Sequence, residues 1–187
     1  WLKQWARLGL PAALVVLVTL VAGSTGLIGV KADVDTTRDG EYAATRAVAS
    51  ARTAAFDAKA NESLTLIARG SGAAFQEAWV ASSEVVATEF DSLDANPVAT
   101  GPDQQLWADY VAAHEEIRAL DDSGDWDGAV ELATGAGTGT GNTTFAAFDE
   151  DSAQVLSDVA DRTASSLADT GGGLPLGGIL SVLVGLL

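Results

Sequence analysis

An uncharged stretch near the start of the chain most constrains what this sequence can fold into. Residues 8–30 contain no Asp, Glu, Lys or Arg, and a helix needs about 20 apolar residues to cross the hydrocarbon core of a bilayer. Lys3 and Arg7 precede the stretch, whereas acidic residues follow it from Asp33 onward. Because basic flanks favour the cytoplasmic side, we predict a cytoplasmic end at 1–7, a transmembrane helix at 8–30 in the cell membrane, and an extracytoplasmic region at 31–169.

A second uncharged run, 170–187, closes the sequence, and we predict that it begins a second transmembrane helix. The chain starts at Trp1, contains no Met and stops inside this run, so we expect it to be a piece of a longer protein. A cleaved signal peptide is the alternative for 8–30, because small residues stand at 22–24. We favour the anchor, since the apolar run continues past that point to Val30.

Charge is distributed very unevenly between these ends. All 26 acidic residues of the chain lie in 33–169, and the chain has only 10 basic residues. Nucleic acids and anionic surfaces bind through Lys and Arg that displace counterions, so a nucleic-acid partner is excluded. Whether the acidic surface binds divalent cations stays open. Cys is absent, which excludes disulfides and thiolate chemistry from the domain.

Apolar residues recur at spacings of three and four through the middle of the chain, which is the pattern of helices. We predict helices at about 33–69, 73–95, 103–121, 125–134 and 144–169, with a flexible glycine-rich loop at 135–144. Phe56, Leu64 and Ile67 count among the apolar positions of the first, and Phe148 and Leu167 are expected to face inward on the last. No segment alternates with period two. The predicted fold is all-α, an up-down four-helix bundle flanked by two transmembrane helices.

Residue types that carry catalysis or bind metals are few. His114 is the only histidine; the HExxH zinc motif would need a second, so we interpret it as a half-buried structural or surface residue. We therefore predict no enzyme, no catalytic residue, no cofactor and no metal site. The ligand-binding residues stay open. Four arginines could each pair an anion, although most are expected to pair with surface carboxylates: Arg46, Arg52, Arg69 and Arg118.

The acidic segment 121–128 has two interpretations. In register with a calcium-binding EF-hand loop, Ser123 and Thr134 would occupy positions that need acidic ligands, so the match fails. The favoured interpretation is a turn that ends one helix and begins the next. In that turn, Ser123 or Asp125 accepts a hydrogen bond from the amides of the following helix.

The segments 110–122 (YVAAHEEIRALDD), 124–130 (GDWDGAV) and 145–149 (FAAFD) resemble a family of actinobacterial membrane proteins with a helical domain between two spans. That family includes the membrane component that relays amino-acid availability, sensed by an extracellular lipoprotein, to a cytosolic Ser/Thr kinase. The layout is also similar to the four-helix-bundle sensor ectodomains of chemotaxis receptors. The resemblance implies an extracytoplasmic fold and a signalling role, and assigns no ligand residue in this chain.

Two functions from different classes follow from this layout. The first is an extracytoplasmic sensor domain that transmits the binding of a small-molecule ligand or a sensor lipoprotein across the lipid bilayer, alone or as a homodimer. The second is a structural or assembly protein of the cell envelope that transmits no signal.

Overall fold

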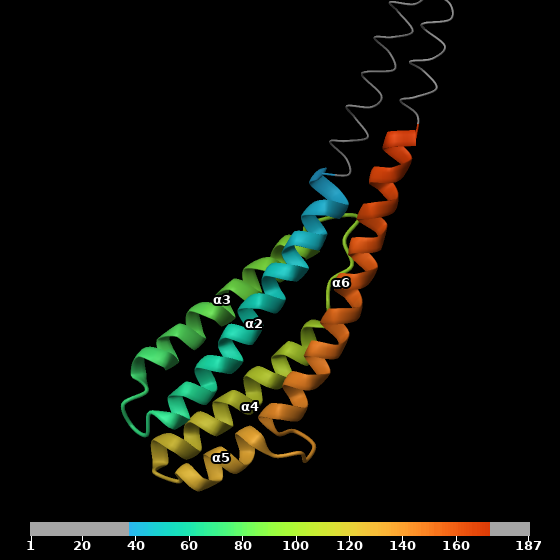
Figure 1. Ribbon diagram of the computed structural model, residues 1–187. Coiled ribbons are helices and arrows are strands. Elements are labelled where there is room, and N and C mark those ends of the chain that lie inside the picture. The colour runs from blue at the N-terminus through green and yellow to red at the C-terminus, as the bar shows by residue number, and fades with distance from the viewer. Residues whose placement is uncertain (1–37, 173–187) are drawn as a thin grey trace, which may run out of the picture. The chain divides into compact units, whose positions relative to one another are not determined.

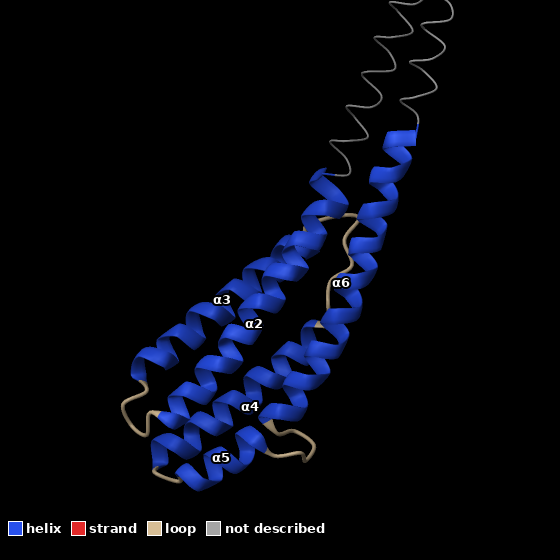
Figure 2. Ribbon diagram, viewed as in Figure 1, coloured by secondary structure: helices blue, strands red, loops and turns tan. Residues whose placement is uncertain are grey.

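The computed structural model describes residues 38–172, and every regular element in this range is a helix (Figure 1, Figure 2). The all-α prediction is confirmed for this range. Among the described helices, none combines the length and apolar character needed to cross a membrane. The predicted span 8–30, and residues 173–187 of the second, lie outside the described range. The elements are η1 (Arg38–Tyr42), α2 (Ala43–Ile67), α3 (Ala73–Asp94), α4 (Gln104–Ser123), α5 (Trp126–Thr134) and α6 (Gly141–Gly172).

Helices α3, α4 and α5 begin and end within two residues of the predicted ranges. The last helix starts three residues earlier than predicted, at Gly141, inside the segment that we expected to be a loop. Gly141 is buried there, and a Cβ on it would come within 2.9 Å of Ile117 Cδ1 and 3.2 Å of the Ala133 carbonyl oxygen. The missing side chain therefore lets α6 begin directly against α4 and α5.

Residues Gly40–Asp161 form one compact unit. Arg38, Asp39 and the end of α6, from Arg162 to Gly172, belong to a second unit. In that second unit Leu167 is 54% exposed, so the inward position predicted for it is wrong. The main hydrophobic core lies in the unit Gly40–Asp161.

Helix α2 packs through small side chains. Val48 and six alanines are buried along one of its faces: Ala44, Ala47, Ala51, Ala54, Ala55 and Ala58. Phe56, Leu64 and Ile67, which the spacing placed among the apolar positions of this helix, are 46%, 39% and 73% exposed. Alanine has no side chain beyond Cβ, so a face of alanines lets a neighbouring helix approach closely, and the larger residues of α2 occupy other faces.

Aromatic side chains from the other helices fill the space that the alanines leave. Trp79, Phe90, Trp107, Tyr110, Phe145 and Phe148 all belong to one buried cluster with the α2 alanines. The Trp107 and Phe148 rings lie 5.2 Å apart, and those of Tyr110 and Phe145 also lie 5.2 Å apart. Each of these pairs joins α4 to α6, so the core combines a small-residue surface with a set of large rings.

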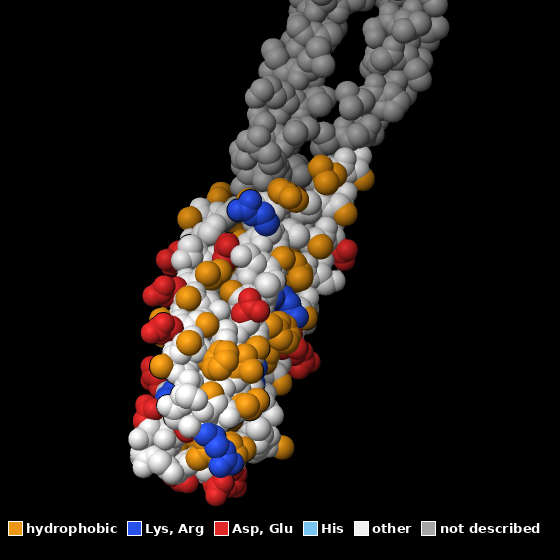
Figure 3. Space-filling view, turned by 60° about the vertical axis from the view of Figure 1, so that its left-hand side comes forward, with side chains coloured by type: hydrophobic (Ala, Val, Ile, Leu, Met, Phe, Trp, Pro, Cys, Tyr) orange, Lys and Arg blue, Asp and Glu red, His pale blue; other side chains and the backbone are white. Residues whose placement is uncertain are grey.

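The surface is acidic, as the composition requires. Figure 3 shows Asp and Glu side chains spread over the face in view, with only a few Lys or Arg among them. Exposed apolar side chains also occur, including Tyr42, Val80, Val85 and Val98.

Candidate functional site

A charged group lies inside the unit Gly40–Asp161, surrounded by partners from two helices. Glu62 of α2 is 1% exposed. Its Oε1 accepts a hydrogen bond from Lys59 Nζ at 2.7 Å, and its Oε2 lies 2.9 Å from His114 Nδ1. The Tyr110 hydroxyl also donates to Oε2, at 3.2 Å. A buried carboxylate is costly unless it is paired and hydrogen-bonded, and here both oxygens have cationic or polar partners.

His114 of α4 lies at the centre of this polar cluster. Its ring stacks on Trp79 of α3 with centroids 3.7 Å apart and an angle of 6° between the planes. The Nε2 atom lies 3.2 Å from Gln76 Oε1. With Glu62 at one ring nitrogen and the Gln76 oxygen at the other, both nitrogens face acceptors when the amide is oriented this way. His114 is 1% exposed, so the half-buried or surface position predicted for it is wrong.

The helical repeat explains why these residues meet. Tyr110 and His114 are four residues apart on α4, and so share a face. Lys59 and Glu62 are three apart on α2 and form an ion pair. We call Lys59, Glu62, Gln76, Trp79, Tyr110 and His114 the polar cluster. Hydrogen bonds within it link α2 to α4 and α3 to α4.

The polar cluster shifts the acidity of two of its members. Burial by itself would raise the pKa of Glu62, but the hydrogen bond with His114 and the charge and hydrogen bond of Lys59 together lower it below its ordinary value of 4.5. The pKa of Tyr110 is raised, first by burial and then by the negative charge of Glu62. Both shifts favour an ionised carboxylate beside a neutral phenol.

The lowered pKa of Glu62 predicts a loss of stability in acid. The folded carboxylate binds its proton less tightly than the unfolded one, so its contribution is complete above the ordinary pKa. It is lost as the pH falls through the folded-state value. Urea denaturation from about pH 7 down to about pH 3 should therefore show the wild type losing more free energy of unfolding than Glu62→Gln, which cannot titrate. Parallel pH profiles for the two proteins would contradict this prediction.

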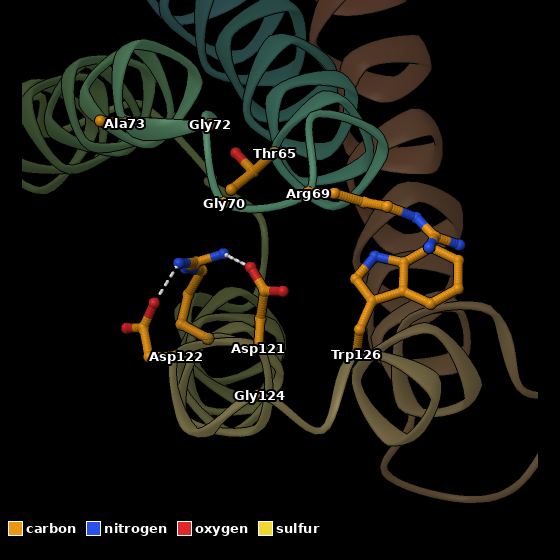
Figure 4. Close-up of a pocket in the computed structure, with 10 residues that line it drawn as sticks. Thr65, Arg69, Gly70, Gly72, Ala73, Asp121, Asp122, Gly124 and Trp126 are labelled. Carbon is orange, nitrogen blue, oxygen red and sulfur yellow. Dashed lines mark hydrogen bonds and ion pairs between the residues drawn. The ribbon is translucent and has the colours of Figure 1, made fainter.

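A pocket lies where the turn between α2 and α3 meets the turn between α4 and α5 (Figure 4). Its cavity volume is about 490 Å³, within the range of small-molecule sites. Its charged lining residues are Arg69, Arg118, Asp121 and Asp122, and the others are Thr65, Gly70, Gly72, Ala73, Gly124 and Trp126. We call this the turn pocket.

Arg69 and Trp126 form one side of the turn pocket. The Arg69 guanidinium carbon lies 3.7 Å from the centroid of the Trp126 ring, and Figure 4 shows the side chain extended over the indole. The indole is itself held in place, because its Nε1 donates to the Leu66 carbonyl oxygen at 2.8 Å. Arg69 also has a φ of 40°, in the left-handed region that favours glycine. Strain of this kind persists where surrounding contacts enforce it.

Arg118 forms the charged side of the same pocket. Its guanidinium donates to Asp121 and to Asp122, each at 2.5 Å, and dashed lines in Figure 4 mark both interactions. The two arginines and two aspartates give the lining a net charge of zero. In a strongly acidic chain, such a surface is electrostatically unusual, because a negatively charged ligand would meet less repulsion here than elsewhere.

The turn pocket lies about one helical turn from the polar cluster along three helices. Thr65 of α2 follows Glu62 by three residues, Arg118 of α4 follows His114 by four, and Gly72, the residue before α3, precedes Gln76 by four. Arg69 lies in the turn after α2, seven residues beyond Glu62. Four residues of helix rise about 6 Å. A change in the walls of the turn pocket therefore acts on helices whose next turn holds buried charges.

The structure separates the four arginines that the sequence left open. Arg52 is paired, donating to the Asp149 carboxylate and carbonyl oxygen and to Ser152 Oγ. Arg118 is paired as described above. Arg46 and Arg69 form no ion pair with any described residue. Of these two unpaired arginines, only Arg69 lines the turn pocket.

Two further predictions concern metals and the 121–128 turn. Over residues 38–172, no three or more His, Asp or Glu side chains come together in a way that could hold a metal ion. Asp125 begins α5, since its side chain accepts from the Gly128 amide at 3.0 Å, as predicted. Ser123 instead donates to the Leu120 carbonyl oxygen and ends α4.

Sequence reasoning did not identify Glu62, Gln76 or Trp126 as site residues. One signal was present: Glu62 and Thr65 stand on the same face of α2 as the buried alanine Ala58, at spacings of four and seven. A carboxylate in register with core positions indicates a buried charge that needs a partner.

Comparison with protein-family models, curated proteins and solved structures yields no match for this chain, so the assignment of the site depends on its geometry.

Proposed function

We propose that this chain is the extracytoplasmic signal-input domain of a membrane protein. In this proposal α2, α3, α4 and α6 form an up-down four-helix bundle between transmembrane helices at 8–30 and 170–187. Ligand or partner binding at the turn pocket is transmitted to those two helices. The observation that carries the proposal is the adjacency of an open, charged pocket to a buried polar cluster. The carboxylate of that cluster belongs to α2, the long helix nearest in sequence to the first uncharged run.

Contacts between α2 and α6 support a role for these two helices as a pair. Arg52 of α2 forms an ion pair with Asp149 of α6 at 2.7 Å. Nearer the start of α2, the Thr45 hydroxyl donates to the Val159 carbonyl oxygen at 3.2 Å. The first and last long helices of the described range are thus tied together by specific polar bonds. A shift of one against the other would break and remake such bonds, as in helix shifts of about 1–2 Å in known switches.

Transmission requires that the ligand bind two arrangements of the helices with different affinity. The polar cluster supplies interactions that depend on helix position, because the bonds of Glu62 and His114 join α2, α3 and α4. A ligand that draws the turn between α2 and α3 toward Arg118 would change the offset of these helices. The free energy available for the shift is the difference between the ligand's two affinities.

The test of this function begins with membrane orientation. The chain contains no cysteine, so a single engineered thiol is the only reactive one. In intact bacteria that express the chain, a membrane-impermeant maleimide should label Ser92→Cys, an exposed position on α3. Lys3→Cys should be labelled only after the cells are permeabilised. Equal labelling of both positions in intact cells would contradict the predicted orientation.

The second stage measures transmission in a chimera that joins the chain, after Leu187, to a histidine-kinase core. Insertion of two glycines after Lys31 should change autophosphorylation in membrane vesicles several-fold, because two extra flexible residues would interrupt the helical connection that this proposal requires. The matched control inserts two glycines at Gly137, in the exposed loop before α6. Both insertions should leave the thermal midpoint near the wild-type value. Equal kinase output in all three proteins would overturn the signalling proposal.

A non-signalling assembly protein of the envelope is the second candidate. It is favoured by exposed apolar side chains on α2 and α3, among them Phe56, Ile67 and Val80, which would suit contacts with a partner protein or a second copy. Correct membrane orientation together with unchanged kinase output in the glycine variants would support this function over the first.

A further inference from the structure

We propose that the turn pocket binds a small oxyanion, a molecule bearing a carboxylate or phosphate group, through the guanidinium of Arg69. This inference deepens the proposed function by naming a ligand class for the same site. It relies on that function for its consequence in signalling, whereas the binding itself can be measured independently.

The pairing of cations in the unit carries the inference. Arg52, Lys59 and Arg118 each form an ion pair with a carboxylate. Arg69 forms no ion pair or side-chain hydrogen bond with any residue in the described part of the chain, although acidic residues are abundant there. Among residues 40–161, Arg46 and Arg69 lack a carboxylate partner, and of these two only Arg69 lies in the wall of the turn pocket.

The Arg69 side chain is held in a form suited to an oxyanion. Its planar group stacks over Trp126, and stacking uses the face of a guanidinium while leaving the N–H groups at its edge free to donate. Trp126 is fixed in turn by its bond to the Leu66 carbonyl oxygen. The contact with Trp126 already restricts the rotamers of Arg69, so that binding an oxyanion costs less side-chain entropy. This favours affinity for the oxyanion. The edge of a guanidinium matches the two oxygens of a carboxylate or phosphate.

Neighbouring residues make the site tolerant of negative charge. Asp121 and Asp122 would repel an oxyanion, but Arg118 is paired with both. Gly70 and Gly72 leave the opposite rim without side chains, and at Gly72 a Cβ would lie 2.8 Å from the Thr65 carbonyl oxygen. The volume of about 490 Å³ admits a small organic molecule. A polyanion would meet the acidic surface around the pocket, so the ligand is a small molecule with one or two negative charges.

The test uses the full 187-residue chain, purified in a mild detergent, with circular dichroism to follow its thermal midpoint. The probes are inorganic phosphate and succinate, each compared with sodium chloride at the same ionic strength. At least one probe should raise the midpoint by a few degrees in a saturable manner, because a ligand that binds the folded state stabilises it. A preference for succinate or for phosphate identifies the chemical class of the natural ligand.

Three variants give the result its specificity. Arg69→Gln should weaken binding at least about 10-fold, the usual effect of losing a charge-assisted hydrogen bond. Arg69→Lys, which keeps the charge but loses the planar fork, should lie between this variant and the wild type. Arg46→Gln removes the same charge from an exposed position on α2 outside the turn pocket and should leave binding unchanged. Equal stabilisation of all variants would overturn the proposal. So would the absence of stabilisation by either probe at concentrations up to about 100 mM, which is about 100 times a millimolar Kd.

The outcomes for the ligand and for signalling are distinguishable. If neither probe binds but the glycine insertion after Lys31 still alters kinase output, the oxyanion proposal fails and the signal-input function stands. If a probe binds through Arg69 while the insertion leaves output unchanged, the turn pocket is a binding site in a protein that does not signal through these helices.

Discussion

Replacing Glu62 with alanine should lower the free energy of unfolding by about 3–5 kcal/mol, the usual cost of removing one partner from a buried ion pair. The carboxylate is 1% exposed and accepts from Lys59, His114 and Tyr110. Its loss leaves these three polar groups without their shared acceptor, and His114 and Tyr110 are themselves buried. Urea denaturation of the full chain in mild detergent, followed by circular dichroism, would measure the change.

Two variants separate charge from general effects of substitution. Glu62→Gln keeps the shape and part of the hydrogen bonding, so its loss of stability should fall between zero and that of Glu62→Ala. Glu115→Ala removes an exposed carboxylate from α4, and should change stability by no more than about 0.5 kcal/mol. A loss below about 1 kcal/mol in Glu62→Ala, comparable to that of an ordinary surface change, would show that the polar cluster contributes little to the fold.

Phe148→Ala should destabilise the protein by about 3–5 kcal/mol, because it removes a large side chain from a closely packed core. Phe148 is 1% exposed. Its ring lies 5.2 Å from Trp107 and 6.4 Å from both Phe90 and Phe145. It therefore joins rings of α3, α4 and α6, and the cavity left by alanine would border all three helices. The same denaturation measurement applies.

Phe56→Ala provides the matched comparison, because the chemical change is identical. Phe56 is 46% exposed, although its ring lies 5.1 Å from that of Phe145. We expect a loss of about 1 kcal/mol, near the centre of the range for point substitutions. Similar losses at positions 56 and 148 would contradict the packing described for α2 and α6.

Helical periodicity was sufficient to predict most of the described secondary structure. Helix α3 runs Ala73–Asp94 against a predicted 73–95, and α4 runs Gln104–Ser123 against 103–121. These helices carry large apolar residues at regular spacing, and glycine or proline marks their ends. The start of α6 was predicted three residues too late. Gly141 is normally unfavourable in a helix, and it is accepted here because of close contact with Ile117 and Ala133.

Periodicity was less informative for burial on α2. The large residues Phe56, Leu64 and Ile67 attract attention in the sequence, yet the core positions of this helix are mostly alanines. Alanine is common on both buried and exposed surfaces, so its spacing is a weak signal. Only the neighbouring rings of the other helices, which need a flat surface to pack against, identify the alanine face as the buried one.

The candidate site illustrates the same limit at the level of single charges. His114 and the arginines could be named from the sequence as groups with binding chemistry. Their partners could not, since Glu62 lies 52 residues from His114 and Asp149 lies 97 from Arg52. With 26 acidic residues in the chain, each cation has many alternative partners, and no spacing rule selects one across helices.

By itself, the sequence determined the all-helical class of the described range, the approximate limits of its helices, the absence of cysteine chemistry and the acidic character of the surface. These properties depend on local spacing and on composition, which can be obtained directly from the order of residues. Only the tertiary structure decided that Glu62 and His114 meet in the interior, and that Arg69 alone among the pocket charges lacks an ionic partner. Such pairings depend on how far each helix is rotated and shifted against its neighbours, and this is set by packing of the whole core.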